Sequence, residues 1–196
     1  VARWGKQWEA NKTRELPQID ELARRIQAAL PESGAPAIVH GDYRLENTML
    51  APDRPEIVAV LDWEMSTLGD PLTDLGLFLV YWVHWDADAD ADGDDGDAGD
   101  RVPLATGGAS GLPGFIGMDE VIARYGAVTG RDLSALDFYI VFAFYKLAVI
   151  LEGINARFLM GKTVGEGFDQ MGRMVTALLD AAFDVADRSE LRALRG

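Results

Sequence analysis

The most informative segment of the chain reads His40-Gly41-Asp42-Tyr43-Arg44-Leu45-Glu46-Asn47. It follows a short apolar run at 37–39, and a second apolar run at 57–61 leads into Asp62-Trp63-Glu64. Short runs that are rich in β-branched residues and bounded by proline or glycine are typical of buried strands. The polar side chains therefore emerge where strands end, and we expect them to face a cleft.

Three oxygen-bearing side chains in this region form a candidate metal site. Asp42 follows the first strand, Asn47 comes five residues later, and Asp62 follows the next strand. Residues 48–50 read as a short strand and 52–55 as a turn, so Asn47 and Asp62 should lie near each other across a hairpin. Carboxylate and amide oxygens suit Mg²⁺, which usually takes one or two carboxylates together with water and phosphate oxygens. One Mg²⁺ could therefore contact both side chains.

The spacing His-x-Asp-x-x-x-x-Asn is the catalytic-loop pattern of phosphoryl-transfer enzymes of the kinase type. Two further motifs follow it, Leu61-Asp62-Trp63-Glu64 and Gly69-Asp70-Pro71-Leu72-Thr73-Asp74-Leu75-Gly76. With these motifs in this order, the chain resembles the aminoglycoside phosphotransferase (APH) family, and most closely its branch that is sometimes fused to acyl-CoA dehydrogenases. The resemblance extends from residue 4 to about residue 162. A lone His-Gly-Asp would carry little weight, because metallophosphatases contain similar tripeptides.

The resemblance implies an α/β fold of the protein-kinase type. Residues 1–196 would form a single domain, the mostly helical C-terminal lobe, with a small β-hairpin that carries the catalytic loop. A loop is expected at 64–68, followed by a helix that runs to about residue 82. The implied activity is ATP- and Mg²⁺-dependent phosphorylation of a hydroxyl group on a small molecule, such as a hydroxyacyl-type metabolite or an aminoglycoside-like compound.

The resemblance also implies roles for the motif residues. Asp42 would accept or orient the hydroxyl proton, while Asn47 and Asp62 would hold Mg²⁺ on the ATP phosphates. His40 would brace the loop by a hydrogen bond to the backbone near Asp62, with a role as catalytic base as the alternative. Asp74 would hold the backbone of the catalytic loop, and the alternative is an ordinary acid in the first turn of a helix.

Four other polar side chains are candidates for contact with the substrate. Glu64 could reach a metal-bound water. The helix expected at 134–160 is apolar nearly all round, and Glu152, Asn155 and Arg157 interrupt it. These three residues either form salt bridges or lie at the surface, or they face the substrate cleft.

A nucleotide-binding lobe is missing from this pattern. In kinase-like folds a separate N-terminal lobe supplies a glycine-rich cover over the phosphates and a strand lysine. No glycine-rich loop between two strands precedes His40, and the preceding residues read as helices at 2–14 and 17–30. We therefore expect the chain to be part of a longer protein whose own N-terminal lobe is its partner. Residues 1–196 alone are expected to be inactive and to bind ATP very weakly.

Composition argues against several other functions. The formal net charge of −14 disfavours nucleic acid and anionic membranes as partners. The absence of cysteine excludes disulfides and thiolate metal sites, and two histidines are too few for a histidine-based zinc site. The longest apolar stretch, 138–151, is shorter than the ~20 residues that span a membrane. A cytoplasmic location is the expectation.

Residues 86–117 are expected to form an acidic and glycine-rich insertion loop. Residues 88–93 match the start of an EF-hand calcium loop, but the twelfth position is Gly99, where a glutamate is required. The two alternatives are a solvated, mobile loop and a Ca²⁺ site, and the missing glutamate favours the first.

A non-catalytic kinase-like binding module is the main alternative to an enzyme. The chain retains Asp42, Asn47 and Asp62 together. A module freed from chemistry has no need of all three, so their presence favours a phosphotransferase. ATP turnover by the complete protein would discriminate between the two.

Overall fold

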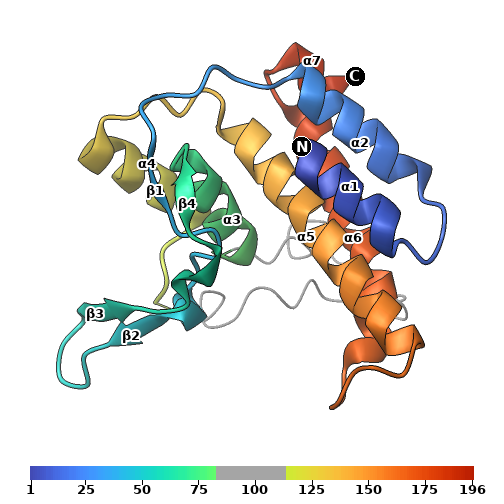
Figure 1. Cartoon of the computed structure of the whole chain (residues 1–196). Helices are drawn as coiled ribbons and strands as arrows, with labels where there is room; N and C mark the ends of the chain where they lie inside the picture. Colours follow the sequence, from blue (N-terminus) through green and yellow to red (C-terminus); the bar gives the residue numbers. More distant parts are fainter. Residues whose placement is uncertain (83–113) are drawn as a thin grey trace, which may run out of the picture.

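The structure, a computed structural model, describes residues 1–82 and 114–196 (Figure 1). Apart from 114–117, the predicted acidic loop and its Ca²⁺ alternative lie outside the described residues. The described chain is mostly helical with two small antiparallel sheets. Its helices are α1 (Ala2–Asn11), α2 (Pro17–Ala28), α3 (Leu72–Trp82), α4 (Met118–Thr129), α5 (Leu136–Leu159), α6 (Met171–Arg188) and α7 (Arg192–Arg195), and its strands are β1 (Ala37–Val39), β2 (Thr48–Leu50), β3 (Ile57–Val60) and β4 (Thr67–Gly69).

Helix α5 is the centre of the fold. It packs against α1, α2, α3 and α6, and Figure 1 shows α1 and α6 running alongside it. Because α5 is apolar on nearly every side, the neighbouring helices cover most of its surface. Phe144 and Tyr145 are almost fully buried. Burial of each side chain of this size contributes about 1.5–3 kcal/mol to the free energy of unfolding. None of the helices among the described residues has the length and apolarity to cross a membrane.

Helices α3 and α5 meet at Gly76. A Cβ atom added there would lie 2.5 Å from the backbone oxygen of Tyr139, a distance that real Cβ atoms do not reach. Only glycine therefore allows the two helices to cross this closely. Asp74 lies in the first turn of α3, so the place where the two helices cross also determines the position of Asp74 relative to α5.

The strands form two separate ribbons. The hairpin expected at 48–61 is present as β2 and β3, with Thr48 opposite Val60. The prediction of a loop at 64–68 is wrong, because this segment overlaps a 3₁₀ turn (Trp63–Met65) and β4. Strand β4 pairs with β1, with Ala37 opposite Gly69. A three-residue strand has little local signal, and here its partner lies thirty residues earlier in the chain.

Candidate active site

The loop between β1 and β2, residues 40–47, carries the motif side chains. His40 is buried, and its Nε2 donates to the carbonyl oxygen of Leu61 at 2.7 Å. Its Nδ1 accepts a hydrogen bond from the backbone N–H of Asp42 at 3.2 Å. Both ring nitrogens are therefore engaged within the protein. This geometry fits the bracing role expected of His40 and leaves no free nitrogen for a catalytic base.

Asp74 joins α3 to the same loop. Its two carboxylate oxygens accept hydrogen bonds from the backbone N–H groups of His40 and Gly41, at 2.6 and 2.8 Å. Hydrogen bonds to an ionised acceptor are the stronger kind. This is the contact that a loop-holding role for Asp74 requires.

Gly41 is held from several sides. Its φ of 86° lies in the left-handed region, and a Cβ atom would lie 2.6 Å from the backbone oxygen of Met65. Its carbonyl oxygen accepts a hydrogen bond from the ammonium group of Lys146 on α5. Lys146 is buried under the ring of Trp4, with Nζ 5.8 Å from the ring centroid. Burial lowers the pKa of Lys146, and the carboxylates of Asp42 and Asp74 oppose that shift.

Asn47 connects Asp42 to the hairpin. Its Nδ2 donates to the carbonyl oxygen of Asp42 at 2.7 Å and to Asp42 Oδ2 at 3.0 Å. The backbone oxygen of Asn47 accepts from the N–H of Leu61 at 2.8 Å, which brings the next residue, Asp62, beside it. Because both amide hydrogens of Asn47 are directed at Asp42, its amide oxygen remains as the acceptor that a metal could use.

Asp62 has a strained backbone. Its φ of 65° makes it the one non-glycine residue with positive φ among residues 1–82 and 114–196. Such strain costs about 1–3 kcal/mol and tends to occur at functional sites. The Asp62 side chain is exposed and receives no hydrogen bond from a described residue. Its carboxylate is therefore available to a ligand.

The oxygen atoms offered by Asn47 and Asp62 suit a Mg²⁺ ion that also binds phosphate groups. Within the described residues, no cluster of three or more His, Cys, Asp or Glu side chains could hold a metal ion alone. Asn47 and Asp62 offer one amide oxygen and one carboxylate. Mg²⁺ is commonly held by one or two carboxylates and completed by substrate phosphates, so this pair suits it.

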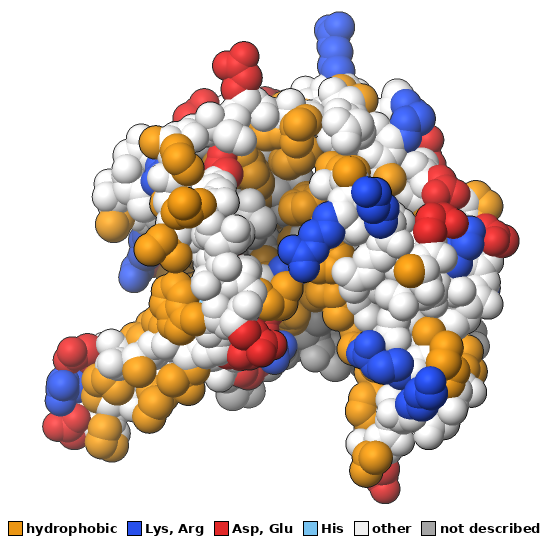
Figure 2. All heavy atoms as spheres, viewed as in Figure 1, with side chains coloured by type: hydrophobic (Ala, Val, Ile, Leu, Met, Phe, Trp, Pro, Cys, Tyr) orange, Lys and Arg blue, Asp and Glu red, His pale blue; other side chains and the backbone are white. Residues whose placement is uncertain are grey.

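An aromatic cavity lies beside the loop 40–47. It has a volume of about 430 Å³, and its lining comes from β1, the loop 40–47, the 3₁₀ turn at 63–65, the start of α3 with the residue before it, and α4. The lining residues are Ile38, His40, Tyr43, Trp63, Pro71, Asp74, Leu75, Phe78, Val121 and Tyr125. Figure 2 also shows a hollow between the strand-bearing part of the molecule and the part that carries α1, with basic side chains on the α1 side of it.

Comparisons with known proteins identify the family and the fold of the chain. The model of the phosphotransferase enzyme family, APH, matches residues 1–106. The chain belongs to the APH family. Mouse acyl-CoA dehydrogenase family member 11 is 31% identical over 195 residues, which cover 96% of this chain and 23% of that protein. Mouse acyl-CoA dehydrogenase family member 10 is 29% identical over 209 residues, which cover the whole of this chain and 17% of that protein.

A solved APH-type structure has the same fold. It is a crystal structure of a Ralstonia eutropha JMP134 protein assigned as an aminoglycoside phosphotransferase, with 29% identity and a TM-score of 0.77. The match covers 96% of this chain and 54% of the solved chain. The chain thus has an APH phosphotransferase fold and spans about half of that protein, and less than a quarter of the two mouse relatives.

The four substrate residues predicted for this APH chain do not share one site, although two of them contact the same residue. Glu152 is fully buried, and its Oε1 accepts hydrogen bonds from the backbone N–H and the hydroxyl of Thr13, at 2.8 and 2.6 Å. Asn155 is also buried and donates to the same hydroxyl at 3.2 Å. Both side chains are buried in contacts with the turn after α1, so they match neither alternative that the sequence left open, a salt-bridged or surface position or one that faces the substrate cleft. Arg157 is exposed in the last turn of α5, and Glu64 is exposed beside Asp62.

The sequence analysis assigned no role to two cations of the candidate site. Lys146 binds the loop backbone, and Arg44 has Nε 3.8 Å from Asp42 Oδ2. Lys146 stands out in the sequence as the one charged residue within the apolar run 138–149, but the sequence does not show what it binds. Arg44 lies inside the motif itself, between Asp42 and Asn47.

The strain at Asp62 gives a stability prediction. Asp62→Gly should raise the free energy of unfolding by about 0.5–1 kcal/mol, because glycine adopts positive φ without steric cost. Asp62→Ala should not raise it, because alanine keeps the strain while it removes the same carboxylate. Urea denaturation of the two variants and the wild type measures the difference. Equal stability of the two variants would show that Asp62 is unstrained.

Proposed function

We propose that this chain is the catalytic part of a small-molecule kinase, which transfers the γ-phosphoryl group of ATP to a hydroxyl group. The observation that supports this most directly is the joined set of Asp42, Asn47 and Asp62. Asn47 is hydrogen-bonded to Asp42 and linked through the hairpin to Asp62. A carboxylate at the reacting centre beside a phosphate-type metal site is the arrangement that phosphoryl transfer uses.

The residues of the chain would have the following roles in the reaction. Asp42 accepts or orients the hydroxyl proton, because its Oδ1 receives no hydrogen bond from a described residue. Asn47 and Asp62 would hold Mg²⁺, which when bound neutralises phosphate charge. His40 and Asp74 fix the loop backbone, so that Asp42 is in position before the substrate arrives.

The acceptor class rests on likeness to relatives. Acyl-CoA dehydrogenase family members among the relatives support a hydroxyacyl-type metabolite, while the solved structure's assignment supports an aminoglycoside-like compound. The same chemistry at Asp42 serves either, because both present a hydroxyl group.

A second lobe is also part of the proposal. Both ribbons expose large apolar side chains: Ile38 and Leu68 of the β1–β4 ribbon are 70% and 75% exposed, and Leu50 of the β2–β3 ribbon is 59% exposed. Figure 2 shows this apolar surface along the strands, which is continuous with the β2–β3 hairpin. Exposed apolar surface of this kind often marks an interface. We propose that the protein's own N-terminal lobe covers it and supplies the groups that bind the nucleotide phosphates.

The function is tested on the full-length protein that contains this chain. ADP release from Mg²⁺-ATP is measured against a panel of hydroxy acids and aminoglycosides, and ³¹P NMR identifies a phosphate monoester product. Acceptor-dependent ADP release that the Asp42→Asn variant lacks supports the kinase. Tight ATP binding without turnover for any acceptor would favour the non-catalytic binding module.

The need for a second lobe gives a separate prediction. Residues 1–196 alone should bind Mg²⁺-ATP very weakly, because Asn47 and Asp62 would contact only the metal and not the phosphates directly. Isothermal titration calorimetry of this fragment measures the affinity, with the full-length protein as the control. A micromolar Kd for the fragment would contradict the requirement for a further lobe.

A further inference from the structure

Arg44 is a cation at the reacting centre whose hydrogen-bonding capacity is only partly used. Its Nε is buried and has no hydrogen-bond partner among the described residues. That nitrogen lies 3.8 Å from Asp42 Oδ2 and 3.9 Å from Glu46 Oε2. Both distances are too long for hydrogen bonds. Arg44 is therefore close to two carboxylates without being bonded to either through Nε.

Tyr81 on α3 keeps the guanidinium in this place. The guanidinium carbon lies 5.0 Å from the centroid of the Tyr81 ring, a cation–π distance. Burial, with a smaller effect of the Asp42 charge, raises the pKa of Tyr81 to about 12. Tyr81 is therefore neutral at physiological pH, and its ring can support the cation without ionising.

A purely structural salt bridge would have another geometry. An arginine that neutralises a carboxylate usually does so through N–H···O contacts of about 2.7–2.9 Å, often in pairs. Lys146, another cation close enough to affect Asp42, already donates to the carbonyl oxygen of Gly41. Arg44 differs from Lys146 because its inner nitrogen still lacks an acceptor.

We infer that Arg44 is a catalytic residue that contacts the transferred phosphoryl group, an inference that rests on the proposed function. The acceptor oxygen forms a bond to the γ-phosphorus while the bond from that phosphorus to the β–γ bridging oxygen breaks. ADP leaves with the bonding electron pair, and the hydroxyl proton passes to Asp42. The equatorial oxygens of the group in transfer carry negative charge, and the planar guanidinium of Arg44 donates to them.

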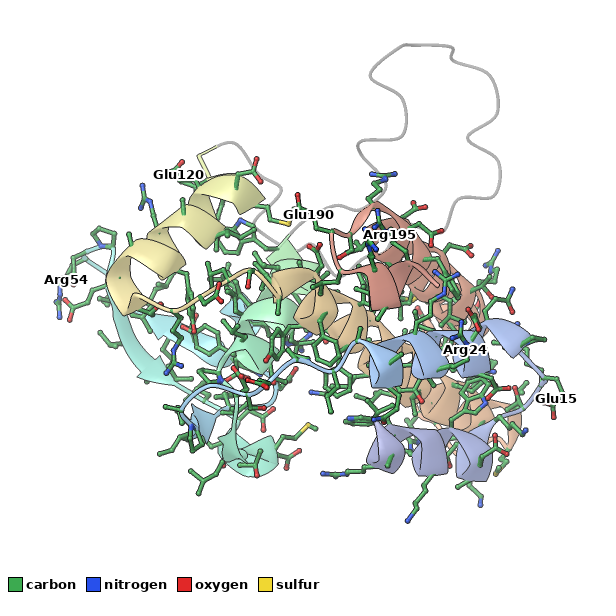
Figure 3. The ribbon with its side chains drawn as sticks, turned by 90° about the horizontal axis from the view of Figure 1, so that it is seen from above. Glu15, Arg24, Arg54, Glu120, Glu190 and Arg195 are labelled. Atoms are coloured by element: carbon green, nitrogen blue, oxygen red, sulfur yellow. The ribbon has the colours of Figure 1, made fainter. Side chains whose placement is uncertain are left out.

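The test uses the full-length protein and compares Arg44→Gln and Arg44→Lys with Arg54→Gln. Arg54 is a matched control, because it lies at the exposed turn of the β2–β3 hairpin and points outward (Figure 3). Two quantities are measured: ADP release from Mg²⁺-ATP with water as acceptor, and the Kd of Mg²⁺-ADP with and without aluminium fluoride. Aluminium fluoride mimics the planar group in transfer, so this binding measurement needs no identified acceptor.

Arg44→Gln should lower kcat by about 10³-fold, as removal of an arginine from a phosphoryl-transfer site does. It should abolish most of the tightening of ADP binding by aluminium fluoride and leave the Kd of Mg²⁺-ADP alone almost unchanged. Arg44→Lys should recover only part of both effects, because an ammonium group cannot bond in pairs. Arg54→Gln should behave as wild type. Guanidinium ion added to Arg44→Ala should restore part of the rate, whereas ammonium should not.

Three results would overturn the inference. An unchanged kcat in Arg44→Gln would exclude a catalytic contact. An equal weakening of ADP binding with and without aluminium fluoride would show ground-state binding only. A lower melting temperature that accounts for the lost activity, without rescue by guanidinium, would show a structural role. Absence of Mg²⁺-ADP and Mg²⁺-ATP binding by the wild type would instead overturn the proposed function, and the inference with it.

Discussion

Asp42→Asn in the full-length protein is expected to lower kcat by about 10²–10⁴-fold, the usual contribution of a general base. The affinity for Mg²⁺-ATP should stay almost unchanged. Asparagine keeps the shape of Asp42 and can still contact Asn47, but it cannot accept the hydroxyl proton. Steady-state kinetics over a range of Mg²⁺ concentrations, together with calorimetric ATP binding, separate the two effects.

Variants of the proposed metal ligands provide the contrast. Asp62→Asn should lower kcat and also raise the Mg²⁺ concentration needed for half-maximal rate, because it removes the exposed carboxylate. Asn47→Ala should resemble Asp62→Asn more than Asp42→Asn. If Asp42→Asn shifted the Mg²⁺ requirement and Asp62→Asn did not, the two roles would be reversed. If neither variant changed turnover, the chain would not be a kinase.

Asp74→Ala is expected to destabilise the chain by about 3–5 kcal/mol, because the N–H groups of His40 and Gly41 both lose an ionised acceptor. The melting temperature should fall by on the order of 10 °C. Asp74→Asn keeps one acceptor oxygen and should cost about half as much. Differential scanning calorimetry of the variants measures both values.

Asp53→Ala is the matched control for Asp74. It removes the same charge from an exposed hairpin turn, where Asp53 pairs with Arg54 at 3.1 Å. Exposed ion pairs contribute about 0–1 kcal/mol, so this variant should melt almost as the wild type does. Similar losses in Asp53→Ala and Asp74→Ala would mean that net charge, and not the loop contact, sets the stability.

The parts of the fold that depend on local pattern could be predicted. The helices at 17–28 and 136–159 follow from apolar spacing and from an apolar run, and the hairpin follows from its turn residues. Strand β4 could not be predicted, because it is a strand only through its pairing with β1, which is distant in sequence. In the candidate site, the motif residues could be proposed from sequence because they are close together along the chain.

The errors and omissions in the site have a common physical cause. Glu152 is 139 residues from Thr13, and Lys146 is 105 residues from Gly41. Contacts over such separations depend on how α1 and the catalytic loop pack on α5. A polar residue in an apolar helix can be recognised as unusual from sequence, but its partner cannot.

The hydrogen bonds that Gly41 makes with Asp74 and Lys146 have a consequence for hydrogen–deuterium exchange. Amides in loops generally exchange through small local openings and take up deuterium early. The Gly41 amide donates to α3 through Asp74, and its carbonyl oxygen accepts from α5 through Lys146. To free this amide, its hydrogen bond to Asp74 must break, and the bond from Lys146 to the same residue opposes the loop movement that would break it. Deuterium should therefore enter at Gly41 about as slowly as in the centre of α5. The loop 40–47 would then open only when the surrounding helices also unfold.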